Sequence, residues 1–254
     1  MDLEKITSLA QNGDIPSMHK LAEYYFDCKE YYKADFWYKK LYNNGLIGAV
    51  TLIALLNNHF AKMHMELDGL SDPETIPAIK EAYVWAKKKK QHIVAGEISV
   101  DSQEKAEAIE EAEAAAYNLA IAHVFRKEYT EIASLSDDLV TTRGKIICGL
   151  GRKLSAKSEA DLYAAYEKLV VLERNTEYAS KSKDSREEFI YTWALIELSN
   201  LCRCGVKNIS ADISRAFDIL SFGNVYVKDT ENKDSIQNEL SHYNKKMFGG
   251  YKYI

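Results

Sequence analysis

The stretch from Ser17 to Ala49 predicts two short helices joined by a polar turn. Its apolar and small residues recur at intervals of three and four, which places them on one face of each helix. They are Met18, Leu21, Ala22 and Tyr25 in the first helix, and Ala34, Tyr38 and Leu41 in the second. A single hairpin of this kind cannot bury both of its faces. We therefore expect hairpins that stack around a continuous core, an architecture typical of binding scaffolds.

The composition favours an all-α chain. The sequence has 254 residues, of which 46% are hydrophobic, and it contains only three prolines. Such a chain can bury a large core, and helices can run almost anywhere along it. Capped helix starts are expected at Asp2, Asp101, Ser158 and Ser185, because each precedes a segment with helical periodicity.

The hairpin also resembles a known repeat family. Met18-x-x-Leu21-Ala22-x-x-Tyr25 and Ala34-x-x-x-Tyr38 keep the spacing of the tetratricopeptide repeat. Residues 33–49 resemble the second half of a Sel-one-like repeat, a relative with a variable loop between its helices. Residues 81–86 and 194–223 are similar to further copies.

The resemblance implies a right-handed α-solenoid of antiparallel helix hairpins. It divides the chain into repeats at 1–94, a divergent or inserted helical region at 95–184, and a last repeat with a capping helix and tail at 185–254. The expected repeat-packing residues are Leu21, Ala22, Tyr25, Ala34, Trp37, Tyr38, Ala82, Trp85 and Ala216. Proteins of this family act as adaptors and regulators in signalling. In bacteria they also take part in secretion, virulence and toxin neutralisation.

A partner surface is expected on the first hairpin and in the C-terminal tail. Tyr24, Tyr31, Asp35 and Tyr42 are predicted to lie off the packing stripe and to line a concave groove. Tyrosine is common among binding hot spots, although extra tyrosines also widen a helix interface. The tail, 248–254, is rich in aromatic residues and either docks on the last repeat or inserts into a partner. Its candidate residues are Phe248, Tyr251 and Tyr253.

Several partner classes are disfavoured. The net charge of −5 and the pI near 5.8 argue against a nucleic-acid surface, which needs concentrated lysine and arginine. No apolar run approaches the length of a membrane span, so we expect a cytoplasmic protein without a membrane role. The four cysteines do not form a disulfide framework. We expect no metal or cofactor, and Cys202 is expected to occupy a packing position of its repeat.

Four biased segments leave alternatives open. The lysine run 87–90 is either a solvated helix end or a contact for an acidic partner, and the glutamates of 104–113 are a solvated face or a contact for a basic partner. The glycines of 144–151 lack the lysine and serine or threonine of a phosphate loop, so they predict close helix packing or a turn. Residues 175–183 are polar and predict a long exposed loop, and a final helix is expected to include Ile236, Leu240 and Tyr243.

No converging set of catalytic residues is recognisable in the sequence. The first hypothesis is therefore a non-catalytic scaffold that binds a protein partner in its groove. A second is a bacterial immunity protein that neutralises a toxin by direct binding. A third is an enzyme or nucleotide-binding regulator with a site in the divergent middle.

Overall fold

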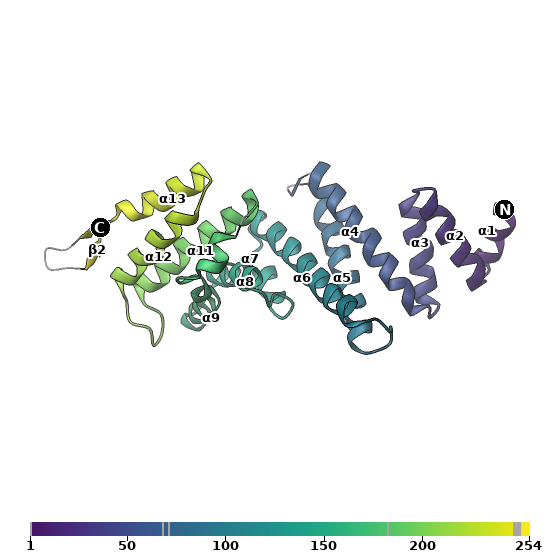
Figure 1. The fold of residues 1–254 in the computed structure, drawn as a ribbon, viewed down its shortest axis with the longest axis horizontal. Coiled ribbons are helices and arrows are strands. Elements are labelled where there is room, and N and C mark those ends of the chain that lie inside the picture. The colour runs from purple at the N-terminus through teal and green to yellow at the C-terminus, as the bar shows by residue number, and fades with distance from the viewer. Residues whose placement is uncertain (1, 68, 71, 182, 246–249) are drawn as a thin grey trace. The chain divides into compact units, whose positions relative to one another are not determined.

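The computed structural model describes residues 2–67, 69–70, 72–181, 183–245 and 250–254. These residues form an all-α protein with one short β-hairpin near the C-terminus (Figure 1). The chain divides into two compact units, 1–122 and 123–254. The boundaries expected from the sequence lie at 94/95 and 184/185. The difference arises because Ala112 and Ala115 pack against Ala86 of the preceding helix, and the helices of 142–169 pack with the helix that starts at Ser185.

The first unit is built from consecutive helices. They are α1 (Leu3–Gln11), α2 (Ile15–Asp27), α3 (Tyr31–Asn43), the 3₁₀ turn η1 (Ile47–Ala49), α4 (Val50–Leu67), α5 (Thr75–Val94) and the part of α6 (Ser102–Phe125) that ends at Ala122. From α1 to α5, each α-helix packs on the next. The caps expected at Asp2 and Asp101 are confirmed, since their carboxylates accept hydrogen bonds from the backbone N–H groups of Lys5 and Glu104.

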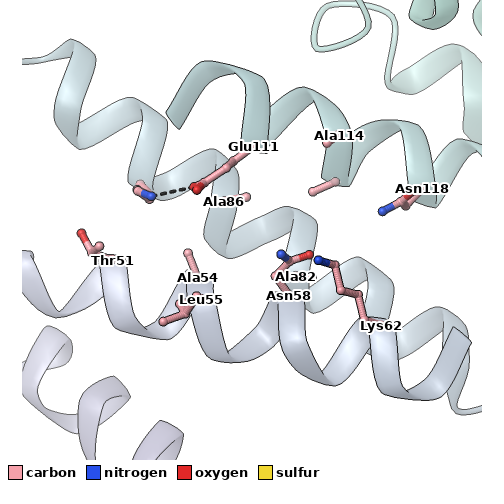
Figure 2. A pocket seen from close by; sticks show the side chains of 12 residues that line it. Thr51, Ala54, Leu55, Asn58, Lys62, Ala82, Ala86, Glu111, Ala114 and Asn118 are labelled. Carbon is pink, nitrogen blue, oxygen red and sulfur yellow. Dashed lines mark hydrogen bonds and ion pairs between the residues drawn. The ribbon is translucent and has the colours of Figure 1, made fainter. Parts of the chain in front are cut away.

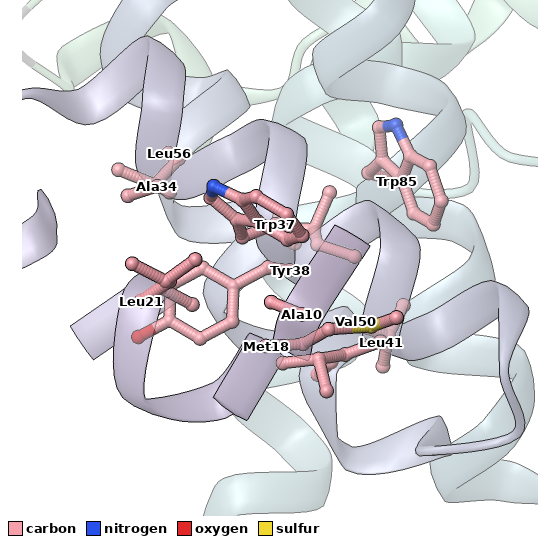
Figure 3. Packing of buried hydrophobic residues seen from close by; sticks show 14 of the residues in the cluster. Ala10, Met18, Leu21, Ala34, Trp37, Tyr38, Leu41, Val50, Leu56 and Trp85 are labelled. Carbon is pink, nitrogen blue, oxygen red and sulfur yellow. The ribbon is translucent and has the colours of Figure 1, made fainter. Parts of the chain in front are cut away.

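The core of the first unit follows the predicted stripe. Ala22 of α2 and Ala34 of α3 are fully buried in the core shared by these two helices. Figure 3 shows Trp37 and Tyr38 in the same cluster as Ala34. Small residues at this crossing let the two helices approach closely, while the aromatic rings fill the adjoining space. The core extends through α4 to Trp85 of α5.

The second unit contains the remaining helices and the hairpin. They are α7 (Tyr129–Ser134), α8 (Thr142–Ser155), α9 (Glu159–Leu169), η2 (Val170–Leu172), α10 (Thr176–Ser180), α11 (Ser185–Cys204), α12 (Ile213–Tyr226), α13 (Thr230–Ser241), β1 (Tyr243–Lys245) and β2 (Tyr251–Tyr253). Helix α8 packs on α7, α9 and α11, and α11 packs on α12 and α13. β1 and β2 are antiparallel, with Tyr243 opposite Tyr253.

Three sequence predictions for the second unit need correction. Residues 175–183 do not form a simple exposed loop, because α10 lies within them and buries Tyr178. The last helix ends at Ser241, and Tyr243 belongs to β1. The N-cap of α11 is Asp184, not Ser185, because the Asp184 carboxylate accepts a hydrogen bond from the backbone N–H of Glu187. Glu188 does not take part in this cap. Its buried carboxylate accepts hydrogen bonds from the backbone N–H groups of Lys228 and Asp229, at the start of α13.

The glycine-rich stretch 144–151 lies inside α8 and is buried except for Lys145, which is exposed. A Cβ atom on Gly149 would lie 2.8 Å from the side chain of Leu169, and one on Gly151 would lie 2.7 Å from that of Ile132. The prediction of close helix packing is therefore confirmed. The N-terminal cap expected at Ser158 is also present, since its hydroxyl accepts from the Asp161 backbone N–H.

Candidate functional site

The predicted repeat-packing residues lie in the cores of their units. Eight of the nine are at most 7% exposed: Leu21, Ala22, Ala34, Trp37, Tyr38, Ala82, Trp85 and Ala216. The ninth, Tyr25, is half-buried and packs against the core cluster of the first unit.

The predicted partner-binding residues of the first unit do not lie together. Tyr24 and Tyr31 are half-buried, and the ring of Tyr31 lies edge-on to those of Phe26 and His59. Tyr42 lies at the other end of α3 and packs edge-on against Trp85. Tyr251 and Tyr253 belong to the second unit. Phe248 lies outside the described residues.

Asp35 was placed off the packing stripe, and this prediction is wrong. Its side chain is buried between α3 and α4, where one carboxylate oxygen accepts a hydrogen bond of 2.7 Å from the amide of Asn57. The other oxygen lies 2.8 Å from the ammonium of Lys39. A buried carboxylate is tolerated because both oxygens are paired.

Lys39 continues this network to α5. Its ammonium lies 2.9 Å from Glu81, which also accepts a hydrogen bond of 2.7 Å from the indole of Trp85. Burial disfavours the charge of Lys39, but its hydrogen bonds to Asp35 and Glu81 outweigh this effect and raise its pKa. Burial likewise opposes the charge of Glu81, yet the bonds from Lys39 and Trp85 lower its pKa. The network joins α3, α4 and α5.

Tyr42 takes part in a second polar chain. Its hydroxyl lies 2.7 Å from Nε2 of His92, and Nδ1 of the same imidazole lies 2.5 Å from the carboxylate of Glu97. The chain fixes the ring of Tyr42 against Trp85 and ties α3 to the C-terminal end of α5. Both the hydroxyl and the ring of Tyr42 are therefore engaged in contacts between α3 and α5.

The lysine run 87–90 is engaged within its unit. Helix α5 continues to Val94, so the prediction that the lysines lie at its C-terminus is wrong. The ammonium of Lys88 lies 4.0 Å from the centroid of the Trp85 ring, and that of Lys89 lies 2.6 Å from the carboxylate of Glu111 on α6. Of the expected acidic face on α6, Glu113 is buried.

A groove that the sequence did not predict lies between α4, α5 and α6. The groove is a pocket of about 260 Å³. Small apolar residues line its floor, and charged or polar residues lie at both of its ends (Figure 2). Its lining residues are Thr51, Ala54, Leu55, Asn58, Lys62, Ala82, Ala86, Lys89, Glu111, Ala114, Ala115 and Asn118. Leu55 is 55% exposed and borders the alanines of the groove. The alanine density of α6 is the one signal in the sequence that points to the groove.

The two ends of the groove differ in charge. At one end, Lys89 and Glu111 form an ion pair between α5 and α6. At the other end, Asn58 and Lys62 project from α4, and Asn118 projects toward them from α6 (Figure 2). Across the described part of the chain, these three side chains have no hydrogen-bond or ion-pair partner. The groove therefore combines an apolar floor with one unbalanced positive charge.

The size and lining of the groove suit a side chain better than a cofactor. Small-molecule sites usually occupy about 300–1,000 Å³, whereas a cavity of about 150 Å³ already holds a benzene ring. The groove thus accommodates one or two apolar side chains. Among the described residues, no cluster of three histidine, cysteine, aspartate or glutamate side chains has the geometry to hold a metal ion.

Comparisons with known proteins found no match: no family model, curated protein or solved structure is similar to the chain. Within the described ranges, each helix is too short or too polar to cross a lipid bilayer.

Proposed function

We propose that the chain is a non-catalytic protein-binding module, and that a segment of its partner docks in the groove between α4, α5 and α6. The exposed Leu55 at the rim of an alanine floor is the observation that carries this proposal. Grooves between helices commonly receive the apolar face of an amphipathic helix. Alanines on the floor allow the backbone of such a helix to come close.

The packing of successive helices supports a repeat architecture of the tetratricopeptide or Sel-one-like kind within each unit. In the first unit, α1 to α5 pack in chain order. In the second unit, α11 and α12 form a hairpin whose turn begins at Gly205 with φ of +75°. A Cβ atom there would also lie 2.8 Å from the backbone nitrogen of Ala211, so the turn requires glycine.

The groove lining supplies binding chemistry. Its alanines and Leu55 offer apolar contact, and its amides and one ammonium offer hydrogen-bond donors. Anchoring of an apolar side chain with a few oriented polar contacts is the usual composition of a peptide-recognition groove. The non-catalytic scaffold expected from the sequence is therefore the function proposed, with its binding site moved from the first hairpin to α4–α6.

Site-specific photo-crosslinking in the source cells tests the proposal. A photoreactive phenylalanine analogue at position 55 is expected to capture a defined protein partner. The same analogue at position 225 is the matched control, because Val225 is 75% exposed and lies in the other unit. The substitution Ala114→Trp fills the groove from α6 and is expected to abolish the crosslink from position 55.

The groove-filling variant must remain folded for the result to be interpreted. Because Ala114 is only half-buried, we expect the thermal unfolding midpoint of the Ala114→Trp variant to differ little from that of the wild type. A second variant, Leu55→Asp, replaces the exposed apolar side chain with a charged one and is also expected to prevent docking. A crosslink that persists in both folded variants would place the partner elsewhere on the chain and contradict the proposal.

A further inference from the structure

The polar end of the groove has a specific chemical preference. Building on the proposed function, we infer that the docked segment carries a carboxylate side chain, which is held by Lys62, Asn58 and Asn118 about two helical turns from an aliphatic anchor beside Leu55. The donors come from two helices, α4 and α6, so the bound group is contacted from two sides (Figure 2).

Charge balance selects an anion for this position. The charged residues that line the groove are Lys62, Lys89 and Glu111. Lys89 and Glu111 neutralise each other at a distance of 2.6 Å. This leaves Lys62 as the unpaired charge of the lining. The whole chain carries a net charge of −5, so an acidic segment is attracted locally by Lys62 although the chain as a whole is negatively charged.

The neighbouring amides complement the ammonium. Asn58 and Lys62 are four residues apart on α4 and therefore share one face, and Asn118 approaches from α6 (Figure 2). An ammonium and two amide N–H₂ groups are all donors, and a carboxylate offers two acceptor oxygens with about four lone-pair directions. Hydrogen bonds to a charged acceptor are stronger than those between neutral groups. A carboxylate can accept a hydrogen bond from each of the three side chains.

The spacing along α4 gives the partner a recognisable pattern. Leu55 and Lys62 are seven residues apart, which corresponds to roughly 10 Å at the helical rise. A partner helix that lies along α4 therefore places its acidic residue about seven positions from its aliphatic anchor. The pattern predicted for the segment is a leucine, isoleucine or methionine with aspartate or glutamate two turns away.

A displayed library of amphipathic helical peptides, selected on the full-length chain, tests this inference. The probe is the peptide library itself, and variant Ala114→Trp serves for counter-selection. We expect enriched peptides to carry an acidic residue about seven positions from an aliphatic one. With Lys62→Glu as the target, the enriched residue at that position is expected to change to lysine or arginine. The control Lys20→Glu reverses an exposed lysine of α2 and is expected to leave the acidic preference unchanged.

A double-mutant cycle then measures the contact in one selected peptide. Lys62→Gln and replacement of the peptide's acid by its amide are each expected to weaken binding only roughly three- to tenfold, because Lys62 is exposed to solvent. The two changes together are expected to weaken binding no more than either change alone.

The outcomes separate this inference from the proposed function. Peptides that depend on the open groove but show no acidic preference, or whose preference survives Lys62→Glu, would overturn the carboxylate assignment and leave the groove as the docking site. If no peptide is enriched over the counter-selection with Ala114→Trp, both the groove and the assignment are refuted.

Discussion

The absence of a Cβ atom at two glycines allows α8 to pack closely on its neighbours in the second unit. Gly149 lies against Leu169 of α9, and Gly151 lies against Ile132 of α7. A glycine in the middle of a helix costs about 0.5–1 kcal/mol relative to alanine, and at both positions this cost is offset by the close approach of a neighbouring helix.

We expect Gly149→Ala and Gly151→Ala each to lower the free energy of unfolding by about 1–3 kcal/mol, because the added methyl group overpacks the contact. Urea unfolding monitored by circular dichroism measures the change. Gly48→Ala is the matched control, since its added Cβ atom meets nothing within 4 Å. If the variants at 149 and 151 were as stable as Gly48→Ala, the close packing of α8 would be refuted.

Cys202 gives a prediction with a defined pH range. The thiol is 1% exposed, and burial raises its pKa from 9.0 to about 11. Between these values the unfolded chain loses the proton while the native chain keeps it, so native stability falls as the pH rises from 9 to 11. Relative to Cys202→Ala, the wild type is expected to lose on the order of 2 kcal/mol over this range. Parallel unfolding curves for the two proteins at every pH would contradict the assignment.

At the scale of the element, the C-terminal hairpin closes the second unit. Tyr251 of β2 stacks on Phe217 of α12 with a centroid separation of 3.7 Å, and the guanidinium of Arg203 lies 4.0 Å from the ring of Tyr253. The hydroxyl of Tyr243 lies 3.0 Å from that of the buried Ser199 on α11. Of the two sequence alternatives for the tail, the described part of it follows the first and docks on its own chain.

The docked hairpin predicts that the tail contributes to stability. Tyr251→Ala is expected to lower the free energy of unfolding by about 1–2 kcal/mol, through loss of apolar burial and of the stacked pair. Hydrogen exchange should increase in β1 and at the adjoining end of α12. Ile254→Ala is the control, because Ile254 is 64% exposed and its truncation removes little buried area. Equal effects of the two substitutions would show that the stacking contact does not hold the hairpin.

At the scale of the whole molecule, the chain consists of two compact units. In the first, the described members of the core cluster around Trp37 fall between Ala10 and Trp85. In the second, Leu198 is fully buried on α11, the helix that packs on α8, α12 and α13. Each unit thus offers a core position whose truncation reports on that unit.

Trp37→Ala is expected to destabilise the first unit by about 3–5 kcal/mol, and Leu198→Ala the second by about 2–5 kcal/mol. Hydrogen exchange read by mass spectrometry should rise in α1–α5 for the first variant and in α8–α13 for the second. A uniform rise across all helices in either variant would show that the chain opens as one cooperative body.

Much of the local structure was predictable from the sequence. The caps at Asp2, Asp101 and Ser158 are present, and Ala34, Trp37 and Tyr38 are buried as their spacing predicted. These features depend on residues within a few positions of one another, so periodicity and side-chain type are sufficient to find them. The burial of Asp35 was not predicted, because its hydrogen-bond partner Asn57 is 22 residues away on another helix.

The sequence by itself determined the all-α class, the hairpin of α2 and α3, and which face of each of these helices is apolar. Only the tertiary structure decided the groove, whose lining comes from residues 51–62, 82–89 and 111–118 on three helices. Helical periodicity shows that a face must be covered but does not show which distant helix covers it, or at what distance. Lys62 and Asn58 of α4 and Asn118 of α6 line the same groove only because the fold places these two helices beside it.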